Sequence, residues 1–241
     1  MNGVLDWLTD PATWSGSEGV WTRTGEHLWY SGLALVIAAV IAIPLGLWVG
    51  HTGRGRFVAV NLTGMLRAVP SLGLLFAALM LLGPRISGQA GVLVPAVLVL
   101  VVLAVPPILA GAYAGVEQTD AAARDAAKGM GMRGREVLWQ VEVPCAMPLI
   151  ASGLRSASLQ VVATATLAAT VGLGGLGRYL IDGIAVRDYA QMAGGAVLVA
   201  ALALLVDFAA AALQRVLVSP GLTRKTVRRN ATSPVDQAPA S

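Results

Sequence analysis

Residues 92–116 read VLVPAVLVLVVLAVPPILAGAYAGV, an aliphatic run without a single charged side chain. A helix rises about 1.5 Å per residue, so a run of this length is long enough to cross the roughly 30 Å apolar core of a lipid bilayer. The strands of a transmembrane β-barrel would instead be short segments of alternating hydrophobicity. The stretch therefore predicts a transmembrane helix.

The rest of the 241-residue chain has the same character. Hydrophobic residues make up 56% of it and charged residues 12%, and the mean hydropathy is +0.71. A soluble protein of this size needs a more polar exterior than such a composition supplies. The composition thus excludes a soluble enzyme, a disordered chain and a disulfide scaffold, and the lone Cys145 has no partner for an intrachain bridge.

Similar runs predict five transmembrane helices, at residues 29–50, 57–82, 92–116, 144–171 and 190–216. The second has a weak point at residues 67–70. The expected fold is an all-α, polytopic membrane protein whose transmembrane domain covers residues 29–216. A periplasmic or interfacial segment over residues 1–28 precedes it. A basic and then Ser/Pro/Ala-rich stretch over residues 217–241 is expected to be a disordered cytosolic tail.

The basic residues indicate the orientation, because Lys and Arg concentrate on the cytosolic side of membrane proteins. Of the 17 Lys and Arg, about 11 fall on the side of the 117–143 connection and about 4 on the other side. We expect a multi-pass protein of the bacterial plasma (inner) membrane with its N-terminus outside and its C-terminus in the cytosol. The net charge of +4 then reflects topology rather than a nucleic-acid surface.

The 117–143 connection is large enough to act on a partner. It begins EQTDAAARDAAKGMG, where Thr119 or Asp120 suits a helix N-cap and the alanines favour a helix. Three glycines then end the helix. This pattern alone also suits an ordinary charged surface helix.

The spacing of residues in this loop resembles the coupling-loop motif of ABC importer permeases. That motif is Glu-Ala-Ala, three residues, Gly, nine residues, Ile, one residue, Leu-Pro. The matching positions here are Asp125, Ala126, Ala127, Gly131, Val141, Val143 and Pro144. Asp replaces Glu, and Val replaces both Ile and Leu. The resemblance implies a type I ABC importer permease-like fold in which Asp125 and Gly131 lead the contact with a separate ATPase.

Other stretches are similar to osmoprotectant permeases, which import glycine betaine, choline, carnitine or proline betaine. They are Glu26-His27-Leu28, Ile43-Pro44-Leu45-Gly46, residues 67–72 (RAVPSL), Gly153-Leu154-Arg155 and residues 172–179 (GLGGLGRY). The resemblance covers residues 26–216. It implies two ATPase subunits that hold ATP and magnesium, a second permease subunit (identical or not), an extracytoplasmic substrate-binding protein and surrounding lipid. No cofactor is expected on this chain.

Alternatives remain open at this point. An amino-acid or methionine importer permease shares the loop motif. A non-transport membrane scaffold and a membrane-embedded enzyme are the alternatives from other classes. A catalytic set of side chains is missing for the enzyme, and the scaffold does not explain the motif spacing.

Two further patterns carry little weight. Gly172, Gly174 and Gly177 satisfy the GxGxxG string of dinucleotide-binding proteins, but they follow a membrane helix rather than a strand. We interpret them as a flexible bend. His27 and His51 fall on opposite sides of the membrane without other ligands nearby, so we expect polar interface residues rather than metal ligands.

Three charges fall inside the predicted membrane helices, namely Arg67, Arg155 and Asp207. At 1.5 Å per residue all three lie at a similar depth, roughly 13–17 Å from the cytosolic end. Charges in a bilayer are costly, so they pair or serve a function. We expect Asp207 to pair with Arg155 or Arg67; the alternative is that the three residues line the substrate path. The sequence assigns no substrate-binding residue.

Overall fold

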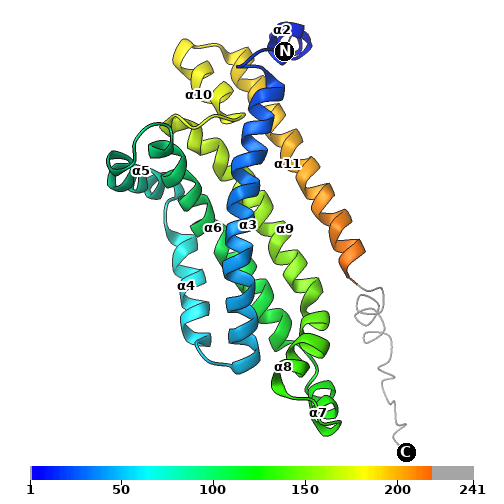
Figure 1. Ribbon diagram of the computed structural model, residues 1–241. Helices are drawn as coiled ribbons and strands as arrows, with labels where there is room; N and C mark the ends of the chain where they lie inside the picture. The colour runs from blue at the N-terminus through cyan, green and yellow to red at the C-terminus, as the bar shows by residue number, and fades with distance from the viewer. Residues whose placement is uncertain (1, 219–241) are drawn as a thin grey trace, which may run out of the picture.

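The structure, a computed structural model, describes residues 2–218, without the side chains of residues 2, 60, 62, 67 and 217. Within these described residues, four helices are long and apolar enough to span a membrane. They are α3 (Val20–Thr52), α6 (Ala90–Glu117), α9 (Val143–Ala168) and α11 (Tyr189–Leu217). Figure 1 shows α3, α6 and α9 side by side and α11 leaning away from them. A broken pair, α4 (Arg56–Ala68) and α5 (Ser71–Leu82), makes a fifth candidate span.

The break between α4 and α5 occurs at the weak point expected from the sequence. The two helices meet at an angle of 95°. Val69 is extended, with φ −74° and ψ 126°, because the ring of the following proline disfavours a helical conformation at this position. The second span is therefore a bent pair rather than one straight helix.

Short elements gather at the two ends of the helix bundle (Figure 1). One end, here called the α10 end, carries α1 (Asn2–Thr9), α2 (Pro11–Trp14), η1 (Gly83–Arg85), η3 (Ala169–Val171) and α10 (Gly177–Val186). The other, the α7 end, carries α7 (Ala121–Gly129), α8 (Gly134–Val137) and the π-helical segment η2 (Leu138–Glu142). No strand occurs among residues 2–218.

The first long helix begins at Val20, earlier than the Trp29 expected from hydropathy. Its first turns are held by tertiary contacts. Nε2 of the buried His27 donates to the Val162 carbonyl at 3.0 Å, and the Tyr179 hydroxyl donates to the Glu18 carbonyl at 2.6 Å. Residues 20–28 of the expected interfacial segment are thus part of the packed helix α3.

Small residues allow the central helices to approach closely. Every fourth residue of α3 from position 34 is small, in the order Ala34, Ala38, Ala42, Gly46 and Gly50. The three alanines are fully buried. A Cβ built on Gly46 would lie 2.6 Å from the Cβ of Ala112 on α6. In lipid no hydrophobic effect drives helices together, because the lipid tails are as apolar as the helix surfaces. Helix association therefore depends on close packing of this kind.

The crossing of α6 and α9 is tighter still. A Cβ on Gly111 would lie 2.5 Å from the Leu149 carbonyl oxygen, and one on Gly153 would lie 2.6 Å from the Pro107 carbonyl oxygen. The two glycines face each other, so neither backbone can move away without opening the interface. This glycine contact fixes how α9 and its preceding loop are placed against α6.

We expect Gly153→Ala to destabilise the protein by about 1–3 kcal/mol, the usual cost of overpacking. The added methyl group must displace backbone rather than a flexible side chain. The measurement is the thermal unfolding midpoint of the purified chain in detergent. Gly32→Ala in α3 is the control, because nothing lies within 4 Å of its added Cβ. Equal midpoints for the two variants would contradict the packing argument.

Candidate functional site: the loop between α6 and α9

The loop from residue 117 to 143 folds into α7, α8 and η2. Asp120 directly precedes the first residue of α7. The Asp120 carboxylate accepts from the Ala122 amide at 3.0 Å, which caps the first turn of α7. The alanines that follow are strong helix formers. Asp120, rather than Thr119, is therefore the N-cap of the motif helix.

Gly131 ends α7 with a left-handed turn. Its φ is +88°, a conformation that glycine adopts without steric cost. Two hydrogen bonds close the turn: the Gly131 amide donates to the Lys128 carbonyl at 2.9 Å, and the Met132 amide donates to the Ala127 carbonyl at 3.1 Å. This pattern is a Schellman motif, so the glycine of the sequence motif is required by backbone geometry.

The motif residues divide between two faces of the loop. Ala127 is buried at 2% exposure, whereas Asp125, Ala126 and Gly131 are exposed. Met130 beside them is 73% exposed. Val141 and Val143 are half-buried in the return to α9, and Pro144 is exposed in its first turn. The structure thus presents an acidic side chain, small residues and a methionine on one accessible surface.

A buried carboxylate joins the loop to the helix bundle. Glu142, the last residue of η2, is 2% exposed. It accepts from Nδ1 of His51 at 2.6 Å and from Nε of Arg124 at 2.7 Å. Arg124 also donates to the Val116 carbonyl at the end of α6. One ionic cluster of Glu142, His51 and Arg124 therefore connects α3, α6, α7 and η2.

Sequence reasoning did not find this cluster. His51 and Glu142 are 91 positions apart, and Arg124 and Glu142 are 18 apart, so no local spacing reveals either contact. A weaker signal was present: Glu142 is a lone acid between Val141 and Val143 at the edge of a predicted span. The π-helical turn around it also marks an irregularity of the kind found at functional sites.

The charges within the membrane segments are partly brought together. Arg155 of α9 and Asp207 of α11 form a bidentate pair, Nε to Oδ1 at 2.5 Å and Nη2 to Oδ2 at 2.6 Å. Such a fork constrains both orientation and distance. The Arg67 side chain lies outside the described residues. Of the two partners expected for Asp207, the structure gives it Arg155, which attaches the outlying α11 to the central helices.

The glycine-rich loop after η3 binds a carboxylate of its own chain. The Gly175 amide donates to Oε2 of Glu26 at 2.8 Å, and Gly175 has φ +94°. Gly174 lies so close to Glu26 that an added Cβ would overlap the carboxylate. The GxGxxG string therefore serves a contact between this loop and α3.

A known family matches most of the chain. The family described as "Binding-protein-dependent transport system inner membrane component" matches residues 42–219. The protein belongs to this family. It is thus a multi-pass membrane protein and a permease component of a transport system that works with a binding protein.

Several characterised permeases are similar to it over most of their length. The glycine betaine/carnitine/choline permease OpuCB of Bacillus subtilis is 34% identical over 200 residues, which covers 83% of this chain and 89% of OpuCB. The choline permease OpuBB of the same organism is 32% identical, with 84% and 90% covered. The osmoprotectant import permease OsmW of Salmonella typhimurium is 32% identical, with 83% and 92% covered.

Solved structures support the fold. The inward-facing MetNI methionine ABC transporter has a chain that matches with a TM-score of 0.73 at 22% identity, covering 88% of this permease and all of that chain. An amino acid ABC transporter matches with a TM-score of 0.65 at 18% identity, covering 81% and 92%. The all-α, type I ABC importer permease-like fold expected from the sequence is confirmed.

The ionic cluster predicts that replacing Arg124 alone lowers the stability more than replacing Arg124 and Glu142 together. Arg124→Met leaves the buried Glu142 carboxylate with His51 alone, which we expect to cost about 2–4 kcal/mol. Arg124→Met/Glu142→Met removes the stranded charge, so part of the stability returns. Thermal unfolding midpoints of the full chain measure both, with the exposed Lys128→Met in the same helix as control. A double variant less stable than the single one would contradict the assignment.

The Arg155–Asp207 pair predicts rescue by exchange of the two charges. Arg155→Leu or Asp207→Leu leaves one charge in the membrane, at a cost of about 3 kcal/mol. Arg155→Asp/Asp207→Arg is expected to recover much of that loss. The variants are compared by the amount of folded protein in membranes and by the thermal unfolding midpoint. Ser158→Ala, one turn away from Arg155 in α9, is the control. If single variants keep full stability and lose only transport, the residues line a path instead of forming a structural pair.

Proposed function

We propose that the protein is the membrane-spanning subunit of an ATP-driven importer that carries quaternary ammonium osmoprotectants such as choline and glycine betaine. ATP and magnesium would be bound by separate ATPase subunits on the cytosolic side. An extracytoplasmic binding protein would deliver the solute, and a second permease subunit would complete the pathway. In this arrangement the α7 end faces the cytosol and the α10 end faces outward.

The observation that supports the proposal is helix α7, which has an exposed face and is joined to the helix bundle through the ionic cluster. Asp125, Ala126 and Gly131 are accessible to a partner, while Ala127 packs inward. Small side chains let a partner surface approach closely, and the exposed Met130 offers an adaptable apolar contact. The accessible face thus has the features needed to fit into a cleft of another protein.

The ionic cluster gives this helix a mechanical connection to the membrane. A partner that displaces α7 acts on Arg124, and through Glu142 on η2 and the start of α9. The same carboxylate is bonded to His51 at the end of α3. ATP-dependent closure of the ATPases would favour one arrangement of these helices over another, which is how a bound partner shifts a conformational equilibrium.

The substrate class rests on the similar permeases. Three of them, at 32–34% identity, are named for choline, carnitine, glycine betaine or osmoprotectant transport. The likeness to the methionine transporter, at 22% identity, shows the fold alone. An amino-acid importer is therefore the second candidate.

Gly131 offers a test of coupling. Gly131→Val places a β-branched residue at φ +88°, whereas Gly131→Asn introduces a residue that tolerates the left-handed region. Each Cβ would point into open space, so the variants differ mainly in backbone strain. We expect uptake of labelled choline in a deletion strain to fall roughly tenfold for Val, equivalent to about 1.4 kcal/mol, and much less for Asn.

Glycine betaine and methionine uptake and co-purification of the ATPase subunits accompany this test. Transport of methionine but not of choline or glycine betaine favours the second candidate. Normal uptake and normal ATPase binding in Gly131→Val show that the α7 turn does not couple the subunits. If no labelled solute depends on the chain, the importer proposal is wrong.

A further inference from the structure

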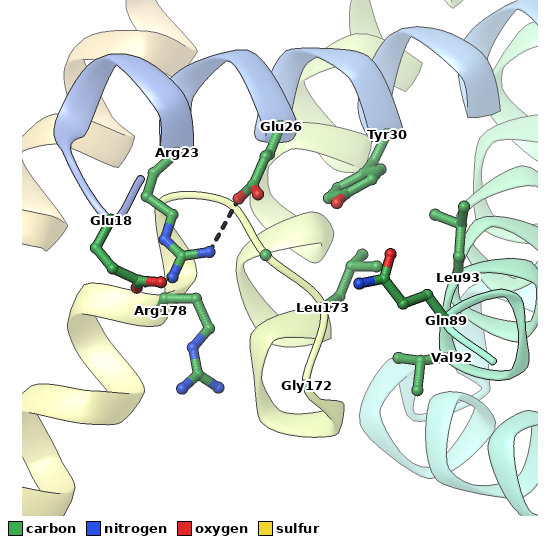
Figure 2. A pocket seen from close by; sticks show the side chains of 11 residues that line it. Glu18, Arg23, Glu26, Tyr30, Gln89, Val92, Leu93, Gly172, Leu173 and Arg178 are labelled. Atoms are coloured by element: carbon green, nitrogen blue, oxygen red, sulfur yellow. Dashed lines mark hydrogen bonds and ion pairs between the residues drawn. The ribbon is translucent and has the colours of Figure 1, made fainter. Parts of the chain in front are cut away.

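A polar cavity of about 470 Å³ lies at the α10 end. It is framed by the first turns of α3, the start of α6 and the loop between η3 and α10 (Figure 2). Figure 2 shows Glu26 and Tyr30 entering it from α3 and Gln89 facing them from the start of α6. Ligand cavities commonly measure about 300–1,000 Å³, so a small solute fits here with room to spare.

Two carboxylates, Glu18 and Glu26, and two guanidinium groups, Arg23 and Arg178, line the cavity. Arg23 pairs with both Glu18 and Glu26, and Arg178 pairs with Asp182 at 2.5 Å. Asp182 does not line the cavity but neutralises Arg178, so the two lining carboxylates, Glu18 and Glu26, share the single charge of Arg23. The cavity is therefore suited to a cation rather than to an anion.

Glu26, one of the two carboxylates that share Arg23, lines the cavity together with an aromatic ring. Glu26 and Tyr30 are four residues apart on α3, so their side chains lie on one face of the helix. The described hydrogen bonds of Glu26, from Arg23 and from the Gly175 amide, both go to Oε2. Figure 2 shows the other carboxylate oxygen on the side of Tyr30.

The glycine loop fixes this arrangement. Gly174 lies where any side chain would overlap the Glu26 carboxylate, and the Gly175 amide holds Oε2 at 2.8 Å. The side chain of Glu26 is 31% exposed, so it is restrained yet accessible from the cavity. The loop thus positions the carboxylate for a ligand.

We propose that this cavity is a transit site for the quaternary ammonium group of the transported solute, held between the ring of Tyr30 and the carboxylate of Glu26. A quaternary ammonium group donates no hydrogen bonds, so it is recognised by negative charge and by the face of an aromatic ring. One ring gives weak binding, which suits a solute that must move on. The inference rests on the proposed function and on the α10 end facing outward.

A thiol-protection experiment tests binding directly. In the complete transporter in lipid nanodiscs, Gln89→Cys on a Cys145→Ser background places one thiol of this chain at the rim of the cavity. Choline is expected to slow its reaction with a maleimide at least roughly fivefold, about 1 kcal/mol of binding contrast. Potassium at the same concentration is the charge control and leaves the rate unchanged.

Variants of the cavity separate a binding role from a structural one. Tyr30→Leu and Glu26→Gln are expected to abolish protection and raise the KM for choline uptake roughly 5- to 10-fold. The glutamine keeps an oxygen for the Gly175 amide. Tyr30→Phe is expected to keep the protection by choline, because the face of the aromatic ring remains. Removing the negative charge of Glu26 should raise the KM for choline more than the KM for zwitterionic glycine betaine. Asp6→Asn, which removes an exposed carboxylate in α1, is the matched control.

Distinct results overturn the transit site and the transport function. Normal choline uptake with no protection, or protection that survives both Tyr30→Leu and Glu26→Gln, overturns the cavity assignment alone. Slower labelling that requires the binding protein but not choline identifies a docking recess and also overturns it. Absence of choline and glycine betaine uptake by the wild-type complex overturns the proposed function and the transit site with it.

Discussion

The close approach of helix backbones at glycine and alanine is the constraint on which the rest of this structure depends. In a membrane, water does not drive helices together, so their association relies on packing and on polar contacts between them. Gly111 and Gly153 bring α6 against α9, and the small-residue stripe of α3 brings it against α6. The position of each loop and cavity follows from these crossings.

Charged groups then act where the packed helices end or diverge. Glu142 lies at the α7 end, where α3, α6, α7 and η2 converge, and its hydrogen bonds from His51 and Arg124 make burial of the carboxylate tolerable. Arg155 and Asp207 join α11 to α9, where few buried residues hold α11. Glu26 joins α3 to the glycine loop at the α10 end. The scarce charges of this apolar chain thus connect elements that small residues alone do not hold.

The two ends of the permease have different chemistry. At the α7 end, the exposed face of α7 offers an acid, small residues and a methionine to a protein surface. At the α10 end, a cavity lined by paired charges and one ring offers weak recognition of a small cation. Under the proposed function, partner proteins would supply the energy and most of the selectivity, and the permease's own side chains would guide the solute between them.

The sequence by itself determined the membrane class, the approximate spans, the break before Pro70 and the loop with Asp125 and Gly131. These depend on local properties, namely the length of apolar runs, the geometry of proline and the turn that a glycine permits. The tertiary structure decided that α3 starts at Val20 and that Asp207 meets Arg155. It also decided that Glu142 joins His51 to Arg124 and that Glu26 and Tyr30 share a cavity with Gln89. Those pairings depend on how helices cross, and the crossings are set by contacts between residues far apart in the chain, which no local pattern records.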